Sequence, residues 1–293
     1  MNWLPVRDGL LQIFDVEHGA CAMLTVNDGA VPRRLMIDCG HNSTTGFNPG
    51  GHLAKLGVRH LEQLVVTNLD EDHVSGYPTF AKNGVTIGWQ LFNPSVRGTD
   101  IADLKSETGM GTGMSALVTG LAGRTTLTPA QCNTLATVLP GVEMQWFWNK
   151  YPHFDDENNL SLMLLVKHRG FWFLFPGDME QTGFKNMLET NEAFRKVVPL
   201  VDVLVASHHG RESGIYKPMF EQYGCNPKLT VISDDVKKHE TQETTNYYGS
   251  KTQGIWFQGP TDSRIRRVLT TRSNGEIRFS FRDGDCFASF ERS

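Results

Sequence analysis

One acidic stretch governs the interpretation of this sequence, and it reads Thr67-Asn68-Leu69-Asp70-Glu71-Asp72-His73-Val74-Ser75-Gly76. It begins at the end of residues 61–67, an apolar run that predicts a buried strand, so its polar side chains stand at a strand end. Adjacent carboxylates repel each other, and a bound cation relieves that repulsion. A solvated acidic loop that caps a helix is the other interpretation. Taken alone, the stretch leaves both open.

Two later strand ends carry groups of the same kind. Asp178 follows the aromatic run 171–175, where a carboxylate needs a charged partner, a metal ion or the N-terminus of the helix expected over residues 181–188. His208 and His209 follow residues 201–207, another apolar run. Histidine is a common metal ligand and titrates near neutral pH, although two satisfied polar side chains would also suit a strand end. The spacing therefore offers three strand ends with potential ligands.

Short strand-like runs separated by turn signals occur in both halves of the chain. Arg169-Gly170 predicts a hairpin between residues 160–166 and 171–175, and Ser273-Asn274-Gly275 predicts another between 266–271 and 276–281. No linker separates the two strand-rich halves, which together favour a two-sheet sandwich with helices outside.

The order of these motifs resembles that of the metallo-β-lactamase superfamily, and more narrowly that of the hydrolase domain associated with the DNA-uptake protein ComEC. Further segments that are similar to this family occur in the same order, at Ile13–Ala20, Leu35–Gly40, Asn158–Leu162 and Thr270–Ile277. The resemblance implies an α/β (α+β) fold, the αββα sandwich of two mixed sheets. We expect one such domain over residues 1–293, with a Gly/Thr-rich insertion at about 94–140.

The resemblance also implies two metal sites. The family signature His-x-His-x-Asp-His reads Asn68-Leu69-Asp70-Glu71-Asp72-His73 here, so both leading histidines are replaced. An oxygen-rich first site, suited to manganese or magnesium, is expected from Asn68, Asp70, Asn159 and a bridging Asp178. A second site, suited to zinc, manganese or iron, is expected from Asp72, His73, Asp178 and His208, with His209 as the alternative histidine. One or two divalent ions are therefore expected.

Two bound metal ions would acidify a bridging water for attack on phosphorus or a carbonyl carbon. Asp72 and Asp178 would position the ions, and a free histidine, His209 or His239, would protonate the leaving oxygen. His239 lies in the charged run Lys237–Glu240, where a solvated surface residue is the other interpretation.

Basic residues late in the chain suggest how a substrate is bound. Between residues 251 and 275 the acid Asp262 stands against five cations: Lys251, Arg264, Arg266, Arg267 and Arg272. Such a cluster could bind backbone phosphates or form the solvated face of a hairpin. The leading hypothesis is a metal-dependent phosphodiesterase or nuclease acting on DNA or RNA. Alternatives are a hydrolase of a small ester, lactam or cyclic nucleotide, and a catalytically degenerate protein that binds a protein partner.

Length and composition limit the classes of protein to which the chain can belong. The chain has 293 residues, with 28 Lys+Arg, 32 Asp+Glu and a net charge of −4. No run approaches the ~20 apolar residues of a membrane span, and the N-terminus lacks the pattern of a signal peptide, so we expect a soluble cytoplasmic protein. Five cysteines without a Cys-x-x-Cys pair argue against a thiolate zinc site or a disulfide framework. Bound divalent cations would offset the net charge, so overall acidity does not exclude nucleic acid.

Overall fold

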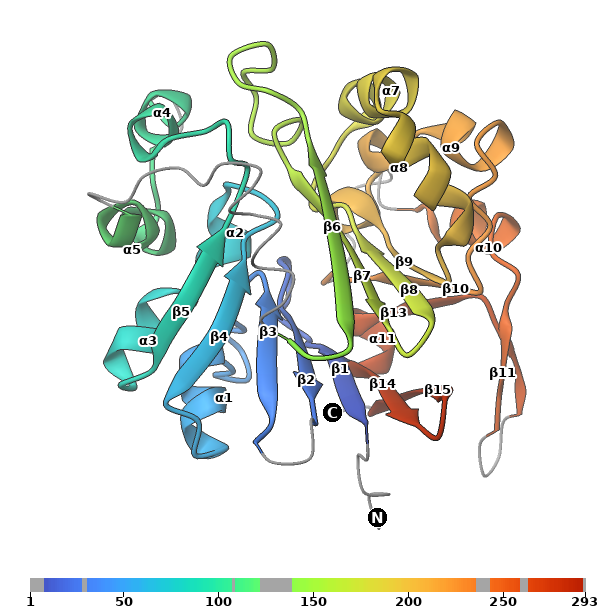
Figure 1. Cartoon of the computed structure of the whole chain (residues 1–293), viewed down its shortest axis with the longest axis horizontal. Coiled ribbons are helices and arrows are strands. Elements are labelled where there is room, and N and C mark those ends of the chain that lie inside the picture. The colour runs from blue at the N-terminus through green and yellow to red at the C-terminus, as the bar shows by residue number, and fades with distance from the viewer. Residues whose placement is uncertain are drawn as a thin grey trace.

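The computed structural model describes residues 8–27, 31–106, 109–121, 139–235, 243–258 and 263–291. Most of its strands form two sheets packed face to face, and a third, two-stranded sheet stands at the side of the molecule (Figure 1). The first sheet has the order β15-β14-β1-β2-β3-β4-β5 and comprises β1 (Gly9–Ile13), β2 (Ala22–Val26), β3 (Arg33–Ile37), β4 (His60–Val65), β5 (Thr86–Leu91), β14 (Glu276–Arg282) and β15 (Asp285–Glu291).

The second sheet has the order β13-β10-β9-β8-β7-β6. It comprises β6 (Val142–Trp148), β7 (Leu162–His168), β8 (Phe171–Phe175), β9 (Val203–Val205), β10 (Leu229–Ile232) and β13 (Val268–Thr270). The small sheet pairs β11 (Ile255–Phe257) with β12 (Arg264–Arg266).

Helices cover the outer face of each large sheet. On the first sheet lie α1 (Pro49–Lys55), α2 (Glu71–Val74), α3 (Pro78–Lys82), α4 (Gly98–Leu104) and α5 (Thr112–Leu121). On the second sheet lie α7 (Gln181–Thr190), α8 (Glu192–Val197), α9 (Lys217–Glu221) and α10 (Thr245–Ser250), with short 3₁₀ turns at Val198–Leu200, Ser207–Gly210 and Glu212–Gly214. Helix α11 (Thr271–Asn274) joins β13 to β14.

The alternation of apolar side chains along the strands produces these four layers. In β7, Leu162 and Leu164 point into the core between the sheets, whereas Met163 and Leu165 point into a second core beneath the helices. Successive side chains of a strand face opposite sides, so a strand that is apolar throughout must be covered on both faces. Both sheets mix parallel and antiparallel neighbours. The expected αββα arrangement of two mixed sheets is confirmed.

The two hairpin predictions have different outcomes. Strands β7 and β8 pair antiparallel across Arg169-Gly170, as expected. The hairpin at 273–275 is wrong, because β13 pairs with β10 in the second sheet and β14 pairs with β1 in the first. The Thr270 hydroxyl accepts a hydrogen bond from Ser273 N, and Thr270 N donates to Asn274 Oδ1, so the segment closes into α11 and carries the chain from one sheet to the other.

Some sequence predictions fall partly or wholly outside the described residues. Of the predicted insertion at 94–140, residues 122–138 lie outside them, and the described part contains α4 and α5. His239 and Cys132 also lie outside. The single-domain assignment stays a prediction. In the described ranges the cysteines are free thiols, and no helix there is long and apolar enough to cross a membrane.

Candidate metal centre

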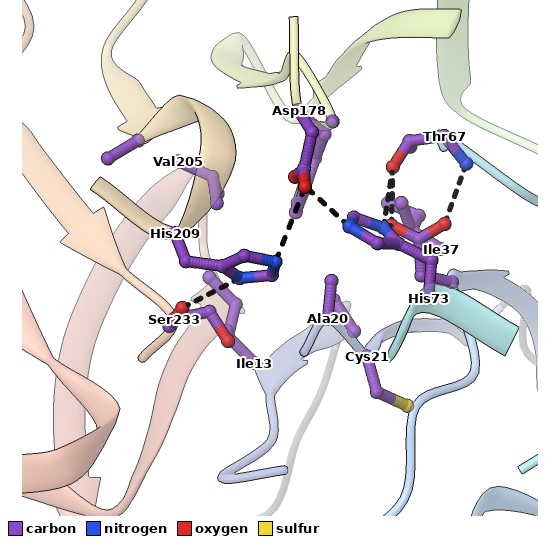
Figure 2. A pocket seen from close by; sticks show the side chains of 15 residues that line it. Ile13, Ala20, Cys21, Ile37, Thr67, His73, Asp178, Val205, His209 and Ser233 are labelled. Carbon is purple, nitrogen blue, oxygen red and sulfur yellow. Dashed lines mark hydrogen bonds and ion pairs between the residues drawn. The ribbon is translucent and has the colours of Figure 1, made fainter. Parts of the chain in front are cut away.

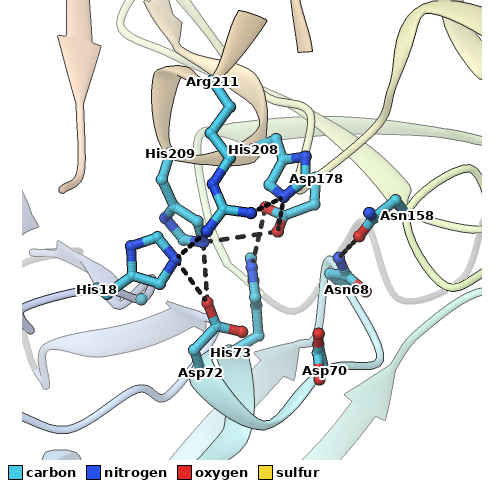
Figure 3. Close-up of polar contacts among 12 residues, drawn as sticks. His18, Asn68, Asp70, Asp72, His73, Asn158, Asp178, His208, His209 and Arg211 are labelled. Atoms are coloured by element: carbon cyan, nitrogen blue, oxygen red, sulfur yellow. Dashed lines mark hydrogen bonds and ion pairs between the residues drawn. The ribbon is translucent and has the colours of Figure 1, made fainter. Parts of the chain in front are cut away.

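Four side chains from three strand ends meet at one edge of the sandwich. They form what we call the ligand cluster, made of Asp72, His73, Asp178 and His209. Each offers one ligand atom, and these atoms all lie within 4.8 Å of one another. Asp72 and His73 lie in α2, the helix that follows β4, whereas Asp178 follows β8 and His209 follows β9 (Figure 3). The cluster thus unites the three motifs of the sequence.

Close backbone packing fixes the part of the cluster that comes from α2. Asp70 caps this helix by accepting a hydrogen bond from Glu71 N at 2.8 Å, and Cys39 N donates to His73 O at 2.7 Å. A Cβ atom at Gly19 or at Gly40 would lie 2.6 Å from the carbonyl oxygen of Asp72. Glycine is required at both positions because any side chain would push α2 away from the sheet.

His73 is held between two carboxylates. Its Nδ1 lies 3.0 Å from Asp38 Oδ2 and its Nε2 lies 3.0 Å from Asp178 Oδ1, with 1% of the side chain exposed. Asp38 is itself positioned by hydrogen bonds from Thr67 N and Thr67 Oγ1. Figure 2 shows Thr67 beside His73, which points toward Asp178. A carboxylate behind a histidine fixes the ring and increases its basicity as a ligand. Asp38 therefore orients His73 toward the cluster.

His209 reaches the cluster through a strained turn. His208 and His209 have φ of 51° and 52°, and Gly210 has φ of 75°. This left-handed region costs a non-glycine residue about 1 kcal/mol, so the surrounding contacts must hold the turn. His208 N donates to Gly177 O at 3.1 Å, and Thr244 Oγ1 donates to Gly210 O. The turn directs the two imidazoles to different sides.

The structure brings His209, the alternative histidine of the sequence prediction, into the ligand cluster in place of His208. The sequence prediction gave His208 as the metal ligand with His209 as the alternative, and His209 or His239 as the free histidine for proton transfer. His209 Nε2 instead lies 3.0 Å from Asp72 Oδ2 and 3.5 Å from Asp178 Oδ2, whereas His208 Nε2 is 3.9 Å from Asp178 Oδ2. The left-handed backbone turns the second imidazole, not the first, toward the cluster.

The cluster groups shift one another's pKa values. Burial raises the pKa of a carboxyl group, but the charges of His209 and His73 outweigh burial and hold the pKa of Asp178 well below its ordinary value. Burial likewise raises the pKa of Asp72, but His209 and His73 lower it to about 2. Burial lowers the pKa of His209, yet Asp178 and Asp72 raise it to about 10. Without a metal ion, the two imidazolium groups therefore balance the carboxylates.

One atom of the cluster shows that a metal ion fits. His209 Nδ1 lies 3.0 Å from Ser233 O, a contact that keeps a proton on Nδ1 and leaves Nε2 to bind an ion once the ring is neutral. The buried Nε2 points into the cluster and, among the described residues, has no partner in hydrogen-bond geometry despite the carboxylates nearby. A buried nitrogen in that position is expected to have a partner, and a cation would supply it. Two imidazole nitrogens and two carboxylates suit zinc, manganese or iron.

The residues predicted to form the first metal site have other partners in the structure and do not converge as the ligand cluster does. Asp70 Oδ1 lies 3.0 Å from Lys105 Nζ, which also contacts Glu157 Oε1 at 2.8 Å, with 5% of the lysine side chain exposed. Asn159 Oδ1 accepts a hydrogen bond from Gly183 N. Asn68 Nδ2 donates to Asn158, while its buried Oδ1 has no hydrogen-bond partner among the described residues. A lysine ammonium thus neutralises Asp70, where the prediction placed a metal ion.

Replacing Lys105 by methionine is expected to lower the free energy of unfolding by about 1 to 3 kcal/mol, because two partly buried carboxylates lose their shared cation. Chemical denaturation would measure this change. Lys196→Met is the matched control, since its pair with Glu192 is 71% exposed on both sides and is expected to contribute about 0.5 kcal/mol or less. Equal effects of the two substitutions would contradict a structural role for Lys105.

The predicted phosphate-binding residues have local partners. Lys251 Nζ lies 2.9 Å from Glu221 Oε1 in α9, and the Arg266 guanidinium stacks over Phe257 and Phe290. Arg264 and Arg267 lie in or beside β12. This strand pairs with β11, which Figure 1 shows at the side of the molecule, away from α2. Arg272, after β13, pairs with Asp234. The described contacts of these side chains do not include the ligand cluster.

Other residues join the site without having been assigned to it from the sequence. Asp38 and His18 lie inside segments that carry the family resemblance, so they could have been found from those motifs. Ser233 follows β10 directly, the same strand-end signal as for the ligands. Lys105 and Arg211 gave no such signal, because a basic residue near a turn is common on any protein surface.

No family model and no curated protein matches the sequence. Among solved structures, the chain is similar to CmlA, a diiron β-hydroxylase from Streptomyces venezuelae, at 14% identity and a TM-score of 0.47, covering 84% of this chain and 51% of that chain. It is also similar to Zn²⁺-bound PqqB from Methylobacterium extorquens, at 12% identity and a TM-score of 0.34, covering 67% of this chain and 71% of that one.

A diphosphatase from the PhnP family is similar at 10% identity and a TM-score of 0.40, covering 96% of this chain and 99% of that chain. The chain spans about half the length of CmlA. Similarity at this level assigns neither a family nor an activity to this protein, and its chemistry has to be inferred from the ligand cluster.

Proposed function

We propose that this protein is a metal-dependent phosphodiesterase that cleaves DNA or RNA with a single metal ion in the ligand cluster. The observation that carries the proposal is the convergence of the ligand cluster on His209 Nε2, a buried nitrogen that lies near two carboxylates but has no partner in hydrogen-bond geometry among the described residues. The described cluster offers ligands for one ion, and Lys105 neutralises Asp70 beside it. The choice of nucleic acid rests on the motifs that resemble the ComEC-associated domain.

A divalent ion bound there would supply the Lewis acidity that activates water and polarises a phosphoryl oxygen. The protein's own side chains would hold and orient the ligands of this ion. Asp178 spans the cluster, with Oδ1 facing His73 and Oδ2 facing His209, and so fixes both imidazoles. His208 is more exposed and lies 3.1 Å from Glu180 Oε1 through Nδ1. That contact places the ring proton of His208 on Nδ1, so His208 is held as a neutral imidazole at the edge of the ligand cluster.

The test is cleavage by protein loaded with manganese or zinc. We expect about one equivalent of bound metal and hydrolysis of bis(p-nitrophenyl) phosphate, single-stranded DNA or RNA that EDTA abolishes and added metal restores. Metal content by mass spectrometry separates the alternatives. Metal-loaded protein that cleaves no phosphodiester would contradict the proposal, and faster cleavage of an ester or lactam would favour the small-substrate hydrolase. Failure to retain any metal would favour the degenerate binding protein.

A further inference from the structure

The ligand cluster is open to solvent at Asp72. The side chains of His73, Asp178 and His209 are 1%, 6% and 3% exposed, whereas that of Asp72 is 26% exposed. Beside Asp72 lies His18, whose Nε2 is 4.0 Å from Asp72 Oδ2 and whose side chain is 34% exposed. A substrate must therefore enter between Asp72 and the residues around His18.

Arg211 lies at this opening. Its Nη2 is 3.0 Å from His18 Nε2 and its Nη1 is 3.1 Å from His208 Nε2 (Figure 3). A guanidinium group only donates hydrogen bonds, so both imidazole nitrogens must be unprotonated acceptors. On His208, Nδ1 lies 3.1 Å from Glu180 Oε1 and 3.0 Å from Ser213 Oγ, which places the ring proton on Nδ1 and leaves Nε2 to accept.

The charge of Arg211 is therefore held by neutral groups. In the described part of the chain it makes no ion pair with a carboxylate, and its two described side-chain partners are the imidazoles of His18 and His208. Neutral acceptors fix the position of a guanidinium without cancelling its charge. Such a group remains able to attract an anion, particularly one that can accept two parallel hydrogen bonds.

The backbone holds Arg211 in this place. Its amide N donates to His208 O at 2.9 Å, and its carbonyl accepts from Gly214 N at 3.0 Å. It follows directly on the left-handed turn at His208–Gly210, which the structure must stabilise against its own strain. The arginine is thereby pre-positioned at the entrance, so that binding an anion there requires little reorganisation.

We propose that Arg211 binds a non-bridging oxygen of a phosphodiester and so positions the phosphoryl group against the ligand cluster. This inference rests on the proposed function. A divalent ion would offset the charges of Asp72 and Asp178, and Arg211 would then present its own positive charge to the negative charge of a phosphodiester at the opening.

The experiment measures binding without turnover. Dimethyl phosphate is titrated into zinc-loaded protein and followed by NMR, with Arg211→Met, Arg211→Lys and a control, Arg59→Met, whose exposed side chain donates to Asn83 O. We expect Arg211→Met to raise the dissociation constant of dimethyl phosphate about 10- to 100-fold, the usual range for loss of a charge-assisted hydrogen bond. Arg211→Lys should retain part of the affinity, and the control should bind as the wild type does. Zinc content should be the same in all four proteins.

Unchanged binding of dimethyl phosphate by Arg211→Met would overturn the proposal. Loss of zinc together with binding in that variant would also overturn it, because Arg211 would then serve to hold the ligand cluster. Equally tight binding of acetate by the wild type would assign the site to carboxylates instead. If binding depends on Arg211 but no phosphodiester is cleaved, the anion site is supported and the proposed function is contradicted. If Arg211→Met cleaves a phosphodiester with an unchanged KM, the proposed function is supported and the anion site is contradicted.

Discussion

Replacing Asp178 by asparagine is expected to weaken metal binding by more than about 100-fold and to abolish measurable hydrolysis. Partners behind metal ligands already contribute 10- to 100-fold to affinity, and Asp178 is placed as a ligand itself. Its two oxygens face His73 at 3.0 Å and His209 at 3.5 Å, so an amide would present an N–H group to at least one of these imidazoles. Metal content after dialysis and the rate of phosphodiester cleavage would measure the two effects.

The same substitution separates metal binding from folding. In the metal-free protein Asp178 is the buried counter-charge of two imidazolium groups, and breaking such a buried pair costs about 3 kcal/mol or more. We therefore expect a lower denaturation midpoint for metal-free Asp178→Asn. Asp70→Asn is the matched control, because it makes the same chemical change in the acidic stretch but contacts Lys105. Full metal content in Asp178→Asn, or equal loss in both variants, would contradict the assignment of Asp178 as a ligand.

Metal affinity is expected to rise steeply with pH. In the metal-free protein Asp178 and Asp72 outweigh burial and raise the pKa of His209 to about 10, and Asp178 and Asp38 likewise raise that of His73 well above its ordinary value. Both imidazoles must lose a proton to bind a metal ion. Release of two protons corresponds to about 100-fold in apparent affinity per pH unit between pH 6 and 9. Competition with a chelator at several pH values would measure the slope.

The stability of the metal-free protein is expected to fall as the pH rises, whereas metal affinity rises. The raised pKa of His209 contributes stability that is fully present below 6.5 and is lost as pH rises toward about 10. The lowered pKa of Asp72 contributes stability that is present above 3.8 and is lost as pH falls toward about 2. Urea denaturation after EDTA treatment should thus show greater stability at pH 5 than at pH 9. A pH-independent metal affinity, with no loss of metal-free stability at pH 9, would show that the imidazoles are not protonated.

Much of the fold could be predicted because the strands are apolar on both faces. Runs such as 162–166 and 201–206 must be buried on both sides, which in a chain with helices between them requires sheets covered by helices. The predicted hairpin at 273–275 was wrong because strand pairing is not decided by the local sequence alone. Its local sequence suits a hairpin, but whether β14 pairs with β13 or with β1 depends on which sheet still has an edge strand that requires a partner, and β1 lies more than 260 residues away.

The sequence by itself determined that acids and histidines gather at three strand ends, because parallel strands that end at one edge bring their following loops together. Only the tertiary structure decided which of them meet. The left-handed turn after β9 selects His209 over His208, and Lys105 neutralises Asp70. Arg211, which lies between two imidazoles, has no motif of its own. Ligand geometry is set by backbone torsions and long-range packing to within about an ångström, whereas sequence spacing determines only which strand end a side chain follows.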